Sequence, residues 1–377
     1  MLYREAGQFK TSYVADQQIF PILQDRIFVA AVIAAAFLAV PAFAGPYLYT
    51  EILIPFLILS LAAIGLNILV GYCGQVSLGT GGFMAVGAYA AYNLWLRVPE
   101  LNNLIVVFLF GGLMSAAIGL LFGIPSLRIK GFYLAVATLV GVLFGVPSLR
   151  IKGFYLAVAT LAAQFFIDWL FARVKWLTNY TPSGSVAVGR LEVFGWHVDT
   201  PADRYLLILG IVVVATVVAK NLVRGHIGRS WMAIRDMDIA AEIIGFRPLR
   251  TKLTAFAVSS FFIGIAGAMW GFLRLGSWEP LAFDINRSFQ ILFMVIIGGL
   301  GSLLGSFLGA AFIVLTPILL NQLPGWLGVH ISTALISHLE FMVFGAMIVF
   351  FLIVEPHGLA RLWAVAKEKL RLWPFPH

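Results

Sequence analysis

Long apolar runs constrain the fold of this chain more than any other feature of its sequence. An α-helix needs about 20 residues to cross roughly 30 Å of hydrocarbon, and most of the runs approach that length. The short alternating strands typical of transmembrane barrels are absent from the sequence. We therefore predict an all-α polytopic membrane protein. The runs are Ile27–Leu48, Ile52–Tyr72, Asn103–Gly123, Tyr205–Ala219, Leu253–Leu273 and Ala334–Val354.

Composition excludes most soluble classes. Hydrophobic residues make up 61% of the 377 residues and charged residues 11%, against about a quarter in soluble domains. The formal net charge of +8 comes from basic residues at the ends of apolar runs, which favours lipid headgroups over nucleic acid as their partner. Because Cys73 is the only cysteine, the chain cannot form an internal disulfide.

The distribution of basic residues predicts which ends of the spans face the cytoplasm. Residues 220–252 contain seven basic and three acidic side chains, so the positive-inside rule places this segment in the cytoplasm. The tail 355–377 is also basic and belongs on the same side. An even number of crossings must lie between them. We predict four: Leu253–Leu275, two passes within Ser288–Gln322 folded at its glycines, and Ala334–Val354.

The same rule orients the first half of the chain. It gives about ten spans in all, with both termini cytoplasmic. Residues 1–26 form a cytoplasmic N-terminal segment, residues 27–354 the transmembrane domain, and Arg173–Arg204 an external loop. "AFA" at Ala42–Ala44 resembles a signal-peptidase site, but the apolar run continues past it, which favours an uncleaved first span. The six spans of this half are Ile27–Leu48, Ile52–Tyr72, Cys73–Trp95, Asn103–Gly123, Gly153–Ala172 and Tyr205–Ala219.

A tandem duplication lies within residues 121–164. "PSLRIKGFYLAVATL" occupies Pro125–Leu139 and recurs, 22 residues later, at Pro147–Leu161. Basic residues flank the uncharged stretch Gly131–Leu149 on both sides, so a single crossing would invert the second half of the protein. The stretch is also too short for two crossings at about 1.5 Å per residue. We predict that one unit is supernumerary and forms a re-entrant, interfacial or other non-crossing helix on the cytoplasmic side.

Two apolar segments are interrupted by glycines, one in each half of the chain. "GYCGQVSLGTGGFMAVG" begins at Gly71 and "GGLGSLLGSFLG" at Gly298. Such pairs of discontinuous helices indicate a translocation path. Close helix packing is the alternative, because Gly301, Gly305 and Gly309 are spaced by four. The predicted path residues are Asn67, Gly74, Gln75, Ser77, Gly79, Thr80, Gly82, Gly299, Gly301, Ser302 and Gly305.

Ionisable residues within the spans are few. Asp168, Arg274, His338 and Glu340 all fall near predicted outer ends, where solvated boundary residues are more common than a proton relay. Proton-driven transport is therefore disfavoured. No paired carboxylates, metal-ligand cluster or nucleophile arrangement supports a membrane enzyme, so we predict no catalytic residues, metal or cofactor.

The cytoplasmic segment contains a predicted amphipathic helix in "GRSWMAIRDMDIAAEIIGFRP". Ser230 is its expected N-cap, and Gly245 and Pro248 follow its end. A helix of this kind could lie on the membrane surface. The mixed signs on its charged face instead favour a protein partner. Ile234, Met237, Ala241 and Ile244 share one face, and Arg235, Asp238 and Glu242 share another.

This loop resembles the EAA-type coupling loop of bacterial ABC importer permeases. Together with "LNILVGYCGQVSLGTGGFMAVGAYAA", "LRIKGFYLAVATLAAQ" and "GGLGSLLGSFLGA", it resembles the M-type permease subunit of branched-chain amino-acid importers. The resemblance extends from about Ile52 to Gly358. The family pattern has one "RIKGFY" unit where this chain has two, and residues 1–26 match nothing in it.

The resemblance implies a non-catalytic subunit of the bacterial inner membrane. A periplasmic binding protein would deliver branched-chain or related hydrophobic amino acids to a heterodimer of this chain and an H-type permease. Two cytoplasmic ATPases would supply the energy; this chain has no GxxxxGK[ST] phosphate-binding loop. A urea or short-amide importer of the same family, and a self-sufficient secondary transporter or channel, are the alternatives. The implied coupling residues are Trp231, Ile234, Arg235, Asp238, Ala241, Glu242 and Gly245.

Overall fold

The computed structural model describes residues 23–128, 154–181, 183–193, 195–327, 333–355 and 358–372. Most of the predicted N-terminal segment lies outside the described residues, and so do residues 129–153, which hold much of the duplication in which one unit was predicted to be a non-crossing helix. In the described part, the second copy of the duplicated sequence supplies the start of a long helix from Phe154. Pro125–Arg128 of the first copy end the preceding helix.

The described chain is built almost entirely of helices, with two short two-stranded sheets. The elements are α2 (Leu23–Phe43), η1 (Leu48–Leu53), α3 (Ile54–Asn67), η2 (Ile68–Tyr72), α4 (Thr80–Arg97), η3 (Pro99–Leu101), α5 (Leu104–Arg128), α8 (Phe154–Arg173), β1 (Val186–Ala187), β2 (Glu192–Val193), β3 (Trp196–His197), α9 (Pro201–Arg224), α10 (His226–Ile243), α11 (Pro248–Met269), η5 (Trp270–Leu275), β4 (Ser277–Trp278), η6 (Pro280–Phe283), α12 (Ile285–Gly298), α13 (Leu303–Leu327), α14 (Thr333–Val354) and α15 (Gly358–Leu372).

The prediction of an all-α polytopic membrane protein is confirmed. Eight helical segments of the described residues are long and apolar enough to cross a membrane. Two further helices, α4 with 18 residues and α14 with 22, occupy the remaining predicted spans. The eight segments are Arg26–Phe43, Leu48–Tyr72, Leu104–Ile124, Leu156–Arg173, Pro201–Arg224, Pro248–Leu275, Pro280–Gly298 and Leu303–Gln322.

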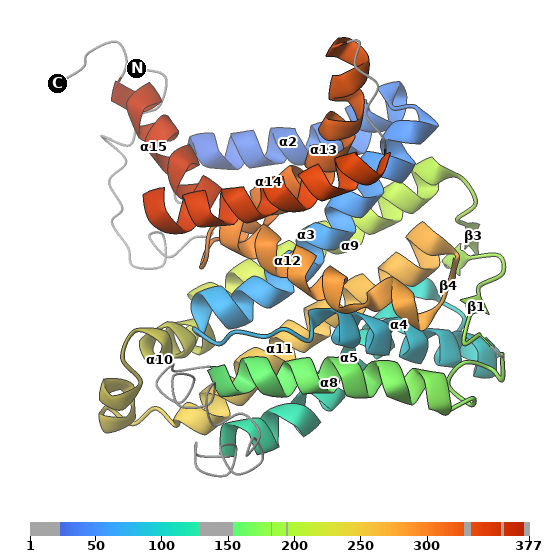
Figure 1. The fold of residues 1–377 in the computed structure, drawn as a ribbon, viewed down its shortest axis with the longest axis horizontal. Coiled ribbons are helices and arrows are strands. Elements are labelled where there is room, and N and C mark those ends of the chain that lie inside the picture. Colours follow the sequence, from blue (N-terminus) through green and yellow to red (C-terminus); the bar gives the residue numbers. More distant parts are fainter. Residues whose placement is uncertain are drawn as a thin grey trace.

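The two ends of the molecule differ in character (Figure 1). Helices α10 and α15 lie at the left end of the long axis, and the short strands β1, β3 and β4 lie at the right end. Strand β1 pairs antiparallel with β4, with Val186 opposite Trp278, and β2 pairs with β3. The long helices connect these two ends, as expected for a bundle that crosses a bilayer.

Spans α3 and α11 form the centre of the bundle. In the segments Leu48–Tyr72 and Pro248–Leu275, 83% of the most apolar window is buried. Glycines allow α4 to lie directly against α11, because a Cβ on Gly87 would overlap the backbone of Gly264, and one on Gly267 would overlap Met84. Close backbone approach at small residues is the usual mode of helix association in lipid, where lipid tails provide no hydrophobic driving force.

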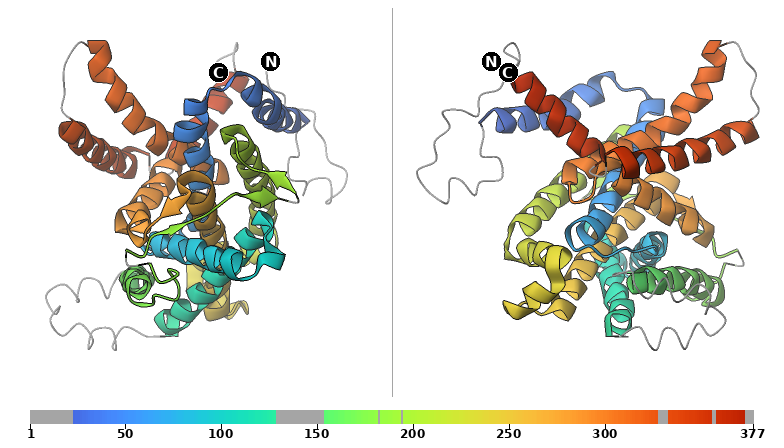
Figure 2. Two further views of the ribbon diagram at one scale, coloured as in Figure 1. Left: turned by 90° about the vertical axis from the view of Figure 1, so that its right-hand side faces the viewer. Right: turned by 60° about the vertical axis from the view of Figure 1, so that its left-hand side comes forward.

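The C-terminal helices extend away from this centre. In Figure 2 the end of α13, in orange, and α14, in red, project from the rest of the bundle. Apolar side chains on these helices are exposed, among them Leu319 at 51%, Met342 at 69% and Ile353 at 77%. Surfaces of this kind face either lipid or another membrane subunit.

Several predicted boundaries are wrong. The span predicted to end at Leu48 ends at Phe43, and the span predicted to begin at Leu253 begins at Pro248. The span predicted for Cys73–Trp95 begins only at Thr80, because residues 73–79 are not helical. The span predicted for Tyr205–Ala219 is longer and extends from Pro201 to Arg224. Its start is fixed by a capping box in which Thr200 and Asp203 bond each other's backbone amides.

Candidate functional site

The first predicted helix break is present between α3 and α4. Segment η2 ends at Tyr72, and the chain continues without helical structure to Gly79. Gly74 has a φ of 70°, a left-handed conformation that favours glycine. Gln75 and Ser77 are buried in this break, although both are polar. The glycines farther along lie inside α4, so Gly81, Gly82 and Gly87 serve packing and do not interrupt the helix.

The second predicted break joins α12 to α13. Gly299 and Gly301 lie between the helices with φ values of 121° and 75°. The alternative interpretation, a packing ladder at spacing four, does not hold at its first member, because Gly301 is in the turn and not in a helix. Gly305 and Gly309 do mediate packing, since a Cβ on either would approach or overlap the backbone of α12.

Asn67 joins the two breaks. Its Nδ2 donates to the carbonyls of Ser302 at 2.8 Å and Gly299 at 3.3 Å and to Ser306 Oγ at 3.0 Å. Its Oδ1 accepts from the amide of Gly301 at 2.8 Å. Asn67 is fully buried, and a Cβ on neighbouring Gly71 would overlap the Gly301 backbone. The structure thus brings the glycine segments of the two halves into direct contact.

The start of α4 is surrounded by polar side chains that the sequence analysis did not identify. Thr160 Oγ1 accepts from the amide of Leu78 at 2.9 Å, and Ser288 Oγ accepts from the amide of Gly81 at 2.7 Å. Gln164 Oε1 accepts from the amide of Gly82. Thr160 and Gln164 are polar residues four apart in an apolar span, and that pattern was the signal that could have identified them.

Two predicted path residues carry polar atoms that the described chain does not satisfy. Gln75 Oε1 and Thr80 Oγ1 are buried and have no hydrogen-bond partner among the described residues. Buried polar groups are nearly always paired, so unpaired ones need a reason. A path for a polar solute is one such reason, because a passing solute can bond them in turn.

Helix α10 corresponds to the predicted amphipathic helix and differs from it in three respects. It begins at His226, so Ser230 is not its N-cap but donates to the carbonyl of Ile227 from within the helix. The helix is kinked at Met237, whose φ and ψ are −150° and 90°. Met237, at the kink, and Ile244, directly after the helix, are exposed at 69% and 73%, so the predicted apolar face is not continuous.

The predicted coupling residues divide into two groups. Trp231, Ile234 and Ala241 are buried, and Trp231 Nε1 donates to Thr254 Oγ1 at 3.1 Å, which fixes α10 against α11. Glu242 is exposed, and Asp238 bonds the amide of Ile239 directly after the kink. Gly245 follows the end of the helix as predicted, with a φ of 101°.

Arg235 reaches from α10 to the first glycine break and the edge of the second. Its Nη1 donates to the carbonyl of Gly71 at 2.8 Å, and its Nε donates to Asp236 at 2.8 Å. A Cβ on Gly74 would lie 2.9 Å from its Cγ, and one on Gly301 would lie 3.4 Å from its Nη1. A side chain predicted to contact a partner therefore also contacts the path segments of its own chain.

An exposed apolar surface covers the outer half of α10. We call it the α10 tip, and it consists of four side chains that are each at least 68% exposed. They are Met237, Ile239, Ile243 and Ile244.

A helical membrane bundle with two glycine breaks in contact, one between α3 and α4 and one between α12 and α13, and with a surface helix bonded to the first, is typical of transport proteins of the permease class. The sequence profile described as "Branched-chain amino acid transport system / permease component" matches residues 48–352. The chain belongs to this family.

Individual relatives agree with the family. The chain is 30% identical over 308 residues to the high-affinity branched-chain amino acid transport system permease protein LivM of Salmonella typhimurium, and equally to LivM of Escherichia coli. Each match covers 78% of this chain and 66% of the relative, just under two thirds. The autoinducer 2 import system permease protein LsrC of Klebsiella pneumoniae is 31% identical over 126 residues, 31% of this chain and 37% of that protein. No solved structure matches the chain significantly.

Proposed function

We propose that this chain is the membrane-spanning permease subunit of an ATP-driven importer for branched-chain or related hydrophobic amino acids. The names of the LivM relatives support the substrate class. The unpaired polar atoms of Gln75 and Thr80, in the first break and at the start of α4, support a path at that place. The chain itself is non-catalytic in this proposal, and hydrolysis takes place on partner subunits.

The hydrogen bond from Arg235 to Gly71 is the observation that carries the mechanism. In the proposal, ATPase subunits contact the α10 tip and move α10 when they close. Arg235 transmits this movement to the carbonyl of Gly71, and Asn67 passes it to the turn at Gly301. The hydrogen bond of Trp231 to Thr254 joins α10 to α11, so that the two helices move together.

The remaining partners and the orientation follow from the same proposal. The α10 end of the molecule faces the cytoplasm of a bacterium and the strand end faces the periplasm, in the inner membrane. Residues 1–26, 220–252 and 355–377 are then cytoplasmic. A related H-type permease completes a heterodimer. Two ATP-binding subunits dock on its cytoplasmic side, and a periplasmic binding protein delivers the substrate on the other side.

Reconstitution tests the proposed function directly. The chain is placed in proteoliposomes with the second permease, the ATPases and the binding protein of its own bacterium, and uptake of radiolabelled L-leucine is measured with and without ATP. We expect uptake only with ATP and with every subunit present. Leucine uptake by this chain alone, driven by an ion gradient, would instead establish a secondary transporter. ATP-driven uptake of urea without leucine would establish the short-amide alternative.

A further inference from the structure

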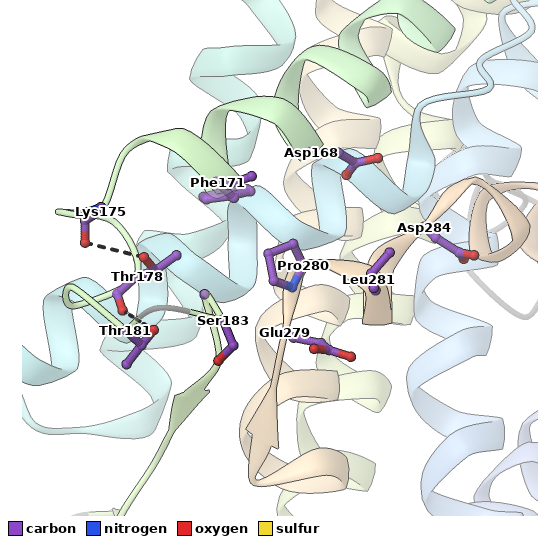
Figure 3. Close-up of a pocket in the computed structure, with 12 residues that line it drawn as sticks. Asp168, Phe171, Lys175, Thr178, Thr181, Ser183, Glu279, Pro280, Leu281 and Asp284 are labelled. Atoms are coloured by element: carbon purple, nitrogen blue, oxygen red, sulfur yellow. Dashed lines mark hydrogen bonds between the residues drawn. The ribbon is translucent and has the colours of Figure 1, made fainter.

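A small cavity opens at the strand end of the molecule, between the end of α8, the loop after it and the segment around η6 (Figure 3). Its volume is ≈ 290 Å³. Pockets for drug-sized ligands begin at about 300 Å³, so this cavity suits a smaller molecule. Its lining is Asp168, Phe171, Ala172, Lys175, Thr178, Thr181, Ser183, Gly184, Glu279, Pro280, Leu281 and Asp284.

The walls of the cavity differ in chemistry. Figure 3 shows Thr178, Thr181 and Ser183 on one side and the carboxylates of Asp168, Glu279 and Asp284 on the other. Phe171, Pro280 and Leu281 supply apolar surface between them. Three carboxylates against one lysine give the lining an excess of negative charge, which favours a ligand with an ammonium group.

The loop that forms the hydroxyl wall is held in place by the bundle. Tyr89 of α4 donates from its hydroxyl to the carbonyl of Gly184 at 3.1 Å, and this bond is buried. Thr181 Oγ1 donates to the carbonyl of Thr178 at 2.8 Å, and Thr178 Oγ1 donates to the carbonyl of Lys175 at 3.3 Å. Hydrogen bonds therefore hold the hydroxyl wall of the cavity in a fixed position.

The cavity is connected to the first glycine break through α8. Gln164 Nε2 lies 3.3 Å from both carboxylate oxygens of Asp168, and its Oε1 accepts from the amide of Gly82. Thr160, one turn deeper, accepts from the amide of Leu78. Polar side chains at spacing four thus lead along one face of α8 from the cavity to the break.

We infer that this cavity is an external binding site for an α-amino acid about to enter the path. The ammonium group of the bound amino acid faces the three carboxylates, and the aliphatic side chain of the amino acid packs on Phe171, Pro280 and Leu281. The inference rests on the proposed function and adds a selectivity step within the permease itself. It also predicts discrimination against urea, which carries no charge for the carboxylates to attract.

Binding to the purified full chain in lipid nanodiscs tests the inference, with radiolabelled L-leucine as the probe. We expect saturable leucine binding. Isoamylamine should compete with leucine, whereas 4-methylpentanoate and urea should not, because only isoamylamine retains the ammonium group. Asp168→Asn and Glu279→Gln should each weaken leucine binding about tenfold or more, since each removes a charge-assisted hydrogen bond. Leu281→Trp adds bulk at the rim of the cavity, where Leu281 is 74% exposed, and should weaken leucine binding.

Glu192→Gln is the matched control, because Glu192 is an exposed carboxylate of the same external loop outside the cavity. It should leave leucine binding unchanged, and a thermal melt of each variant checks folding. Absence of saturable leucine binding to the folded wild-type chain would overturn the inference. So would leucine binding that Leu281→Trp and both acidic variants leave unchanged.

The failure of this inference and the failure of the proposed function give different results. If the reconstituted complex imports leucine with ATP but the chain alone binds none, the external site is wrong and the importer function stands. If the complete complex imports no leucine at all, the proposed function fails.

Discussion

Arg235 occupies an unusual position for a residue of a surface helix. Its guanidinium contacts a backbone carbonyl inside the bundle, while the outer half of its helix carries exposed apolar residues. A charged donor on a partly buried carbonyl contributes about 1.5–3 kcal/mol, which corresponds to about ten- to a hundredfold in an equilibrium. The side chain can therefore determine whether α10 and the first break move together.

Arg235→Ala should lower leucine uptake about tenfold or more in the reconstituted importer while ATP hydrolysis continues, because the ATPases still close but their movement no longer reaches Gly71. Uptake per ATP hydrolysed is the measurement. Arg235→Lys should restore part of the coupling, since lysine keeps one charged donor. Arg229→Ala, at an exposed arginine of the same helix, should behave as wild type. Equal losses of uptake and hydrolysis in Arg235→Ala would contradict a coupling role.

Asn67→Ala should destabilise the chain, because it removes four hydrogen bonds between the halves and leaves buried backbone groups unpaired. We expect a loss of about 1–3 kcal/mol, seen as a lower midpoint of thermal unfolding in detergent. Asn321 is an exposed asparagine whose amide bonds only the local carbonyl of Pro317, so Asn321→Ala is the control. An unchanged midpoint for Asn67→Ala would show that Asn67 does not hold the halves together.

At the scale of elements, α4 and α11 are in contact through glycines. Gly87→Leu should disrupt this contact, since a Cβ at position 87 already overlaps the Gly264 backbone. We expect a loss of at least about 3 kcal/mol, above the usual cost of an overpacked core, because backbone atoms cannot move aside. The yield of monodisperse protein and its thermal midpoint are the measurements. Gly210→Leu, on α9 with no atom within 4 Å of the added Cβ, should be tolerated. Equal tolerance of both variants would refute the packing role.

The turn after α10 gives a second prediction for an element. Gly245 has a φ of 101° and no atom within 4 Å of an added Cβ, so a bulky residue strains the backbone without a steric clash. Gly245→Trp should cost about 1–3 kcal/mol locally, shift the end of α10 and uncouple ATP hydrolysis from uptake. Gly189→Trp, in open space in the loop between α8 and α9, is the control. Unchanged leucine uptake in Gly245→Trp would show that coupling does not depend on the position of the end of α10.

Local sequence signals predicted the elements, while the contacts between them could not be foreseen. Glycine density identified both breaks, and the basic segment identified α10 and the turn at Gly245. The same density suggested that Gly81 and Gly82 interrupt a helix, which is wrong because packing against α8 and α12 favours small residues there. The kink at Met237 and the reach of Arg235 to Gly71 depend on tertiary contacts, and no local pattern encodes them.

At the scale of the whole molecule, the exposed apolar arms α13 and α14 and the α10 tip lie on different parts of the bundle. In the proposed complex, the arms meet lipid and the second permease, and the tip meets the ATPases. This division explains why a monomeric bundle exposes apolar residues both along its spans and at one end.

A single cysteine placed at the α10 tip can show whether this surface docks onto an ATPase subunit in the cytoplasm. Cys73 is the only native cysteine and is buried, so Ile243→Cys adds one reactive thiol at a side chain that is 80% exposed. We expect this thiol to be protected from membrane-impermeant maleimide in intact cells and to crosslink to an ATPase subunit in inside-out vesicles, with a yield that changes with nucleotide. Labelling from outside intact cells, or a complex in which no ATPase lies within reach of residue 243, would contradict it.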